Sequence, residues 1–134
     1  MARTRAAAIV VRDGHVLLMR RRRDGQEYWV VPGGGIEPGE SAVEACLREL
    51  AEETSLVGDR ADRVHTDPDL HTHYFLVSGA RGEPQLGGAE AARNCAANRY
   101  RLDWVRSDAL PRMLRPESAR RAIAAAVNWG DRAG

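Results

Sequence analysis

Three glutamates at helical spacing are the residues of this chain best placed to do chemistry. Glu49, Glu52 and Glu53 lie in a segment that begins at Gly34 and reads GGIEPGESAVEACLRELAEETSL. On a helix, which turns about 100° per residue, the three carboxylates fall within an arc of about 100°. Like charges this close destabilise a helix by roughly 0.2–0.5 kcal/mol per pair, and Arg48 offsets only part of that. The cluster therefore predicts a bound cation.

The ligand type narrows the identity of that cation. An all-oxygen carboxylate set suits Mg²⁺, with Mn²⁺ as a substitute. Glu37 and Glu40 add two carboxylates just before the helix, and the run Pro32–Gly35 lets the backbone pass close to a ligand. A solvated acidic helix face is the alternative interpretation of the three glutamates taken alone.

The whole segment resembles the Nudix box, G-x5-E-x7-R-E-U-x-E-E-x-G-U, in which U is a bulky aliphatic residue. The positions matched in register are Gly34, Glu40, Arg48, Glu49, Leu50, Glu52, Glu53 and Leu56. The one departure is Ser55, where the family has a glycine that ends the helix in a left-handed conformation. Serine there is expected to cost about 1 kcal/mol, or to shift the end of the helix toward Gly58.

The resemblance implies a MutT-type fold and activity. The fold is an α/β/α sandwich with a mixed, partly antiparallel sheet between helices, built by residues 1–134 as a single domain. The activity is Mg²⁺-dependent cleavage of a phosphoanhydride bond in a nucleoside diphosphate linked to another moiety. That substrate class covers ordinary or oxidised nucleoside triphosphates, nucleotide sugars and dinucleoside polyphosphates. An RNA 5′-end pyrophosphohydrolase and a non-catalytic nucleotide-binding module are the alternatives; the intact glutamates argue against the module.

The resemblance also assigns roles by position in the box. Arg48 would orient Glu49, which is one candidate for the general base. Glu90, in the long polar stretch between Gly79 and Asn98, is the other candidate. The residues implied as metal ligands or metal contacts are Glu49, Glu52, Glu53, Gly33 (through its carbonyl) and Glu40.

Substrate contacts are expected from three places. Strand alternation places Arg20 and Arg22 on one face of a strand, where they could meet a phosphate; a solvated edge that discourages strand pairing is the alternative. Gly34 and Gly35 would let the substrate approach the backbone. Tyr74 offers an aromatic ring for a base, with a place in the core as the alternative.

Turn signals and periodicity indicate the elements that position these residues. Asp13-Gly14, between two apolar runs, predicts a hairpin. Ser41 and Glu44 form a capping-box pattern at the start of a helix ending near Thr54. That helix is expected to bury a stripe of Val43, Cys46, Leu47, Leu50 and Thr54. Further strands are expected at 6–11, 15–20, 28–31, 63–66, 71–78 and 100–105, and a final helix at 116–129.

Composition limits the cellular setting and the partners. The 134 residues carry a formal charge of only +1, so no broad basic field for duplex nucleic acid is indicated. The first apolar run is too short for a signal peptide or a membrane span. Cys46 and Cys95 form neither a disulfide framework nor a metal motif. We therefore expect a cytoplasmic monomer or homodimer that acts on a small nucleotide, with neither membrane nor nucleic acid as partner.

Overall fold

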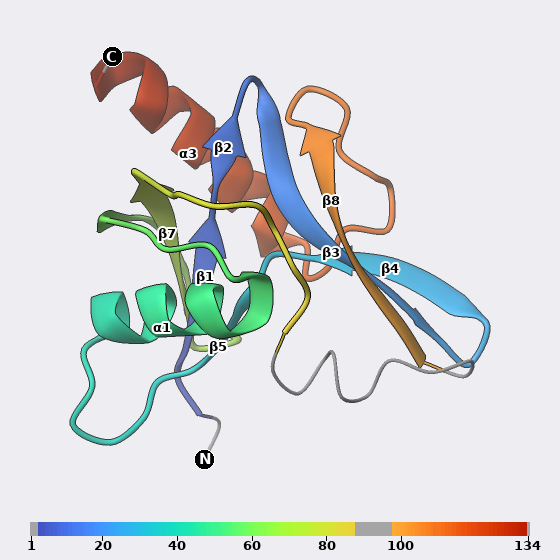
Figure 1. The fold of residues 1–134 in the computed structure, drawn as a ribbon, viewed down its shortest axis with the longest axis horizontal. Helices are drawn as coiled ribbons and strands as arrows, with labels where there is room; N and C mark the ends of the chain where they lie inside the picture. The colour runs from blue at the N-terminus through green and yellow to red at the C-terminus, as the bar shows by residue number, and fades with distance from the viewer. Residues whose placement is uncertain (1–2, 88–97, 134) are drawn as a thin grey trace.

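Two β-sheets and two helices make up the part of the chain that the computed structural model describes, residues 3–87 and 98–133 (Figure 1). In chain order the elements are β1 (Arg5–Ile9), β2 (Val11–Arg12), β3 (His15–Arg23), β4 (Gln26–Val30), β5 (Gly33–Gly35), α1 (Ala42–Thr54), β6 (Arg60–Asp67), β7 (Thr72–Ser78), β8 (Asn98–Arg106) and α3 (Ser118–Ala133).

The first sheet is mixed and the second is antiparallel. In the first, the order is β5-β1-β7-β6, and β1 runs parallel to β7 but antiparallel to β5. In the second, β3 is the central strand, with β8 along one edge and β2 and β4 along the other. The predicted α/β fold with a mixed sheet between helices is confirmed, although the sequence did not reveal that the strands divide into two sheets.

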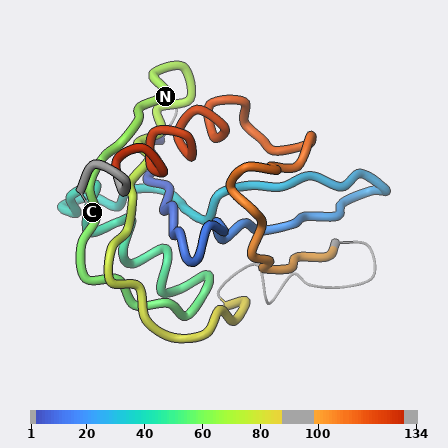
Figure 2. The backbone as a smooth tube through the Cα atoms, turned by 90° about the horizontal axis from the view of Figure 1, so that it is seen from above, coloured from blue at the N-terminus to red at the C-terminus, as the bar shows by residue number. Residues whose placement is uncertain are grey.

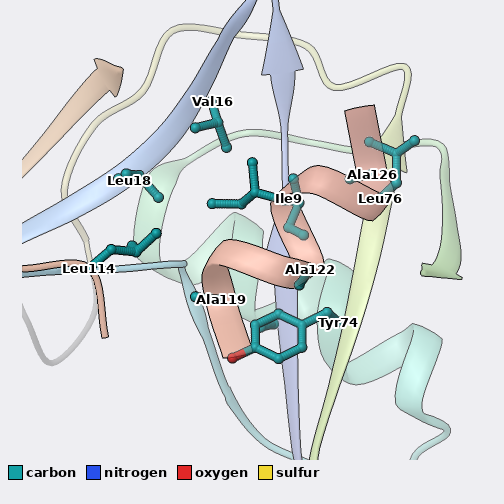
Figure 3. Packing of buried hydrophobic residues seen from close by; sticks show 11 residues of the cluster. Ile9, Val16, Leu18, Tyr74, Leu76, Leu114, Ala119, Ala122 and Ala126 are labelled. Atoms are coloured by element: carbon teal, nitrogen blue, oxygen red, sulfur yellow. The ribbon is translucent and has the colours of Figure 1, made fainter. Parts of the chain in front are cut away.

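Strand β1 is buried on both faces, which explains its uninterrupted apolar sequence. Figure 2 shows α1 and α3 on opposite sides of this strand. Ala6 and Ala8 belong to the core beneath α1, whereas Ala7 and Ile9 belong to the core beneath α3. Figure 3 shows Ile9 in that second core, where alanines of α3 line the facing surface. The small side chains allow both helices to approach the sheet closely.

Two Asp-Gly dipeptides close hairpins in the second sheet. The predicted turn at Asp13-Gly14 has φ values of 51° and 74°, and Asp24-Gly25 repeats it with 51° and 77°. Positive φ at both central residues is what a two-residue hairpin requires. The second hairpin was not predicted, although the arginine run was already expected to lie on a strand. The hairpin pairs that end of β3 with β4, so the run lies on a strand paired along both edges.

Helix α1 begins with the predicted capping box. The Glu44 amide donates to Ser41 Oγ over 3.1 Å, and the Ser41 amide donates to the Glu44 carboxylate over 3.0 Å. The expected apolar stripe is correct at Cys46, Leu50 and Thr54, which are fully buried. It is wrong at Val43, which is 38% exposed, because Ala45 rather than Val43 turns toward the sheet.

The helix ends at the departure from the box. Ser55 has a φ of 68° and its amide donates to the Ala51 carbonyl over 3.0 Å, so serine itself adopts the left-handed conformation. The alternative end near Gly58 is not used. The final helix starts at Ser118, two residues later than expected, and its Ala119 and Ile123 are buried.

Neither described helix is long and apolar enough to cross a bilayer. The single domain, the cytoplasmic location and the oligomeric state stay predictions.

Substituting Ser55 by glycine should stabilise the fold, because glycine adopts positive φ without the penalty that a Cβ brings. We expect the free energy of unfolding to rise by about 0.5–1 kcal/mol, measured by urea denaturation. Ser78→Gly is the matched control: Ser78 is exposed at the end of β7 and is not among the residues with positive φ. There the same substitution should lower stability, and a gain at both positions would refute the argument.

Candidate functional site

The guanidinium of Arg48 forms hydrogen bonds to three carboxylates of the box segment, those of Glu40, Glu49 and Glu52. Its Nε and Nη2 atoms donate to the two oxygens of Glu40 over 2.7 and 2.9 Å. Nη1 donates to Glu49 over 3.0 Å and to Glu52 over 3.2 Å. Nη2 also donates to the carbonyl of Gly35 over 3.1 Å. One planar group thus joins the start of α1, its acidic face and the adjacent strand β5.

This ion-pair network shifts the acidity of its members. The hydrogen bonds from Arg48, and then the one from the Glu37 amide, lower the pKa of Glu40 to about 2. The same partner, Glu40, raises the pKa of the Arg48 guanidinium. Both groups are therefore charged throughout the physiological pH range, and the bidentate pair closes the loop before α1 onto the helix.

The three box glutamates differ in how far they are exposed to solvent. The Glu52 side chain is 53% exposed and that of Glu49 is 15% exposed, whereas Glu53 as a whole is only 6% exposed. A solvated acidic helix face, the alternative interpretation of these glutamates from the sequence, is therefore wrong for Glu53. Its carboxylate accepts a hydrogen bond from the Gly33 amide over 3.1 Å, which compensates part of the cost of burial.

The glycines of β5 make room for these carboxylates. A Cβ on Gly34 would overlap the carboxyl group of Glu49. A Cβ on Gly33 would overlap the backbone of β1 at Ala6. The absence of side chains therefore allows α1 to place Glu49 and Glu53 directly against the β5 backbone.

A second segment completes the C-terminal end of α1. The Gln85 amide donates to the carbonyl of Thr54 over 2.7 Å, and the Gly87 amide donates to the carbonyl of Glu53 over 2.9 Å. These bonds satisfy carbonyls that have no partner within a helix end. No signal in the sequence had indicated this contact. Glu90, the alternative base, lies outside the described residues.

A cavity of about 260 Å³ opens beside Gly33 and Glu53. Its wall is formed by both sheets and by the segment that precedes α3. Residues that contribute charged or polar groups to its wall include Arg5, Arg21, Gly33, Glu53, Tyr74 and Arg115. Three arginines and one carboxylate give this arginine-lined cavity a positive wall, which suits an anionic ligand.

The arginines of the cavity are not those expected from the sequence. Arg21 lines it, whereas Arg20 and Arg22 are not among its lining residues and, by strand alternation, lie on the other face of β3. Arg20 instead lies over the ring of Trp29 at 5.7 Å. Arg115 is brought in by pairing of its segment with β4, where its amide donates to the Trp29 carbonyl over 2.8 Å.

Tyr74 forms part of the cavity wall but is only 1% exposed. Its hydroxyl and that of Ser118 are 2.9 Å apart and hydrogen-bonded. Burial raises the pKa of Tyr74. These contacts fit a core residue that anchors the start of α3 better than a ring that stacks on a base. Of the two other expected contacts, Gly34 touches Glu49, and Gly35 accepts from Arg48.

The chemistry of the donor set fits a hard divalent cation. Glu49, Glu52 and Glu53 supply only oxygen, and Gly33 and Gly34 leave the backbone close to two of them. Within residues 3–87 and 98–133, no three His, Cys, Asp or Glu side chains converge as a finished metal cage. Arg48 bonds to Glu49 and Glu52 instead, so the donors fit an open site better than an all-protein cage.

Comparison with known proteins identifies the family. The model of the NUDIX domain matches residues 2–126, and the chain belongs to the Nudix family. The crystal structure of a MutT NUDIX hydrolase from Burkholderia pseudomallei superimposes with a TM-score of 0.69 at 28% identity, covering 93% of this chain and 98% of that one. The solution structure of the E. coli ORF135 protein gives 0.72 at 25% identity, with 96% and 91% covered.

Two proteins with similar sequences have names that state different substrates. A Bacillus subtilis protein named "Putative 8-oxo-dGTP diphosphatase" is 32% identical over 119 residues, covering 86% of this chain and 74% of the relative. An RNA pyrophosphohydrolase of Erythrobacter litoralis is 32% identical over 107 residues, covering 66% of this chain and 65% of the relative. The predicted Nudix-type pyrophosphohydrolase is thus confirmed at the level of the family.

The pair between Glu40 and Arg48 should make stability depend on acidity. The folded pKa of Glu40 is about 2, below its ordinary value of 4.5, so its contribution is complete above pH 4.5. That contribution is lost as the pH falls from about 4.5 to about 2, because the folded state must then take up a proton. We expect the difference in stability between the wild type and Glu40→Gln to shrink as the pH falls through this interval. Thermal denaturation of both proteins at a series of pH values measures that difference.

Glu117→Gln serves as the control, because the Glu117 side chain is 86% exposed. Its difference from the wild type should be small at every pH. A Glu40→Gln difference that stayed constant between pH 6 and pH 2 would contradict the role given to the pair.

Proposed function

We infer that this chain hydrolyses a phosphoanhydride bond in a nucleoside diphosphate derivative. The observation that carries the proposal is the placement of Glu49 and Glu53 against the glycine strand β5, directly beside the arginine-lined cavity. The carboxylates provide negative charge for a cation, and Arg5, Arg21 and Arg115 provide positive charge for phosphates. A phosphate chain that runs from the cavity toward α1 would meet both.

Members of this family generally use a divalent metal such as Mg²⁺, and we propose the same here. Glu49, Glu52 and Glu53 would hold it, together with the Gly33 carbonyl. When bound, a divalent cation neutralises charge on the diphosphate and makes the attacking water more acidic. Both oxygens of Glu40 already bond to Arg48, which favours a bracing role for Glu40 over direct ligation.

Glu49 is the better supported candidate for the general base. Arg48 donates to one of its oxygens, and Gly34 leaves space for the carboxyl group, so its position is fixed from two sides. A carboxylate held in this way can accept a proton from water without a prior rearrangement. Arg48 positions Glu49 and does not itself touch the reacting atoms in this proposal.

The substrate class includes nucleoside triphosphates, oxidised nucleotides, nucleotide sugars and dinucleoside polyphosphates. The relative from Bacillus subtilis supports an oxidised nucleoside triphosphate, and the RNA pyrophosphohydrolases support a triphosphate at the end of an RNA. A panel of these compounds, with release of phosphate distinguished from release of pyrophosphate, tests the proposal. Failure to cleave any member in the presence of Mg²⁺ or Mn²⁺ would refute it.

Activity should depend strictly on a divalent cation and on the glutamates that would hold it. Turnover should vanish in excess chelator and return with Mg²⁺ or Mn²⁺. Glu52→Gln and Glu53→Gln should lower kcat by at least about a hundredfold, since each removes charge stabilisation that is used in the transition state. Glu117→Gln, an exposed and charge-matched control, should leave kcat within about twofold. Near-normal turnover in both site variants would mean that these carboxylates hold no metal.

Comparison of Glu49 with Glu90 should identify the base. Glu49→Gln should lower kcat by about two to four orders of magnitude, because the carboxylate that accepts the proton is lost. Glu90→Gln should cost about tenfold or less, mainly through KM. Both are measured at saturating metal, with a titration of the metal concentration to separate weakened metal binding. The opposite ranking would move the base to Glu90.

A further inference from the structure

The outer part of the second sheet carries a dense group of arginines. We define the basic ribbon as residues 20–28 of the β3–β4 hairpin together with residues 99–103 of β8, which project away from both helices (Figure 1). It contains six arginines against three carboxylates, although the whole chain has a formal charge of only +1. The positive charge is therefore concentrated on this projection.

The position of these arginines within the sheet is energetically unfavourable by itself. Arg20 is the direct cross-strand partner of Arg101, and Arg22 is the partner of Arg99. Like charges directly opposite one another destabilise a sheet. Nor are the charges on β3 protecting a free edge, because β3 is paired with β4 on one side and with β8 on the other. Carboxylates offset part of this repulsion, because Arg20 Nη1 lies 3.9 Å from Glu27 Oε1 and Arg101 Nε lies 3.3 Å from Asp103 Oδ1. These four arginines therefore do not themselves require a ligand.

The two faces of the basic ribbon differ in what accompanies the arginines. On the face that continues the cavity, Arg21 lies over the ring of Tyr100 at 5.5 Å, and Arg115 lies over the ring of Tyr28 at 5.1 Å. Arg21 and Arg115 also line the cavity itself. The pairs Arg21–Tyr100 and Arg115–Tyr28 therefore place cationic and aromatic groups on the sheet surface next to the cavity. Arg20, Arg22, Arg99 and Arg101 lie on the opposite face.

The size of the cavity limits what it can enclose. At about 260 Å³ it lies near the lower end of small-molecule sites, which typically begin at about 300 Å³. It can take phosphate groups or part of one nucleotide, so the remainder of a larger substrate must lie outside it. The adjoining surface offers guanidinium groups for phosphates and flat rings for bases.

We propose that the cavity-side face of the basic ribbon, formed by Arg21, Tyr28 and Tyr100, together with the adjoining Arg115, binds single-stranded nucleic acid with its 5′-phosphate end in the cavity. The arginines contact backbone phosphates, and bases stack on the tyrosine rings and on the guanidinium planes. The inference rests on the proposed function for the chemistry at the 5′ end. It favours the alternative of an RNA 5′ end over the small nucleotide that the sequence led us to expect. The near-neutral total charge argued only against a broad basic field for duplex nucleic acid.

Binding is tested with a single-stranded RNA of roughly eight nucleotides, long enough to follow such a surface, that carries one 5′-phosphate. The probe has no anhydride bond to cleave, so its affinity is measured independently of turnover, by fluorescence anisotropy in Mg²⁺ buffer. Arg21→Gln/Arg115→Gln should raise Kd by about tenfold or more. The slope of log Kd against log salt should fall by about 1.4, because each phosphate contact on a single strand contributes about 0.7.

The opposite face provides a control with the same change in charge. Arg22→Gln/Arg99→Gln should raise Kd by less than about threefold. Equal losses in the two double variants would overturn the proposal, because they would reflect bulk charge alone. Tyr28→Leu/Tyr100→Leu should weaken binding without changing the salt slope, and thermal denaturation checks that every variant is folded.

Two further probes separate nucleic acid from other ligands. Inorganic polyphosphate carries the charge without bases, and binding as tight as that of the RNA would overturn the proposal. A DNA of the same sequence that bound equally well would support it, since no contact to a 2′-hydroxyl is invoked. Hydrolysis of small nucleotides without oligonucleotide binding would refute this inference alone. Oligonucleotide binding without any hydrolysis would refute only the proposed function.

Discussion

The ion pair between Arg48 and Glu40 is the interaction on which the site depends. It joins two parts of the chain that would otherwise be independent, the loop after β5 and the middle of α1. A guanidinium can satisfy several carboxylates at once because its donors lie in one plane, and here the same group also reaches Glu49, Glu52 and Gly35. Without Arg48, Glu49 and Glu52 would lose the donor that they share, and the repulsion between neighbouring carboxylates would no longer be offset there.

The packing of α1 makes this network possible. The helix lies on β1 through small side chains, and its buried Cys46 and Leu50 face the sheet while Arg48 remains partly exposed beside them. Burial raises the pKa of the Cys46 thiol to about 12, so this cysteine is an inert packing residue. The core therefore determines the rotation of the helix, and that rotation directs Glu49 and Glu53 toward β5.

Local signals in the sequence were sufficient for α1 and for the first hairpin. The capping box at Ser41 and the dipeptide Asp13-Gly14 act over a few residues, and both were predicted correctly. Positions that depend on distant partners were predicted less well. Val43 was assigned to the core because it is apolar, although its exposure follows from how the helix meets β1.

The arginines of the cavity also depend on distant partners that the local sequence does not reveal. Alternation along β3 correctly separated the run into two sets, but only the strands that flank β3 reveal which set faces the cavity. Arg5 and Arg115 were missed because they reach the cavity from other elements. The roles assigned to Glu49, Glu52 and Glu53 came from the box pattern, and the structure adds their surroundings, including the burial of Glu53.

Glu53 belongs to two hydrogen-bonded contacts at once. Its side chain accepts from the amide of Gly33, and its main-chain carbonyl accepts from the amide of Gly87. Two segments far apart in the chain are thereby tethered to a single residue at the end of a helix. The position of the helix end therefore fixes the backbone at Gly33 and at Gly87 relative to each other, so a displacement of the end of α1 would move both segments together.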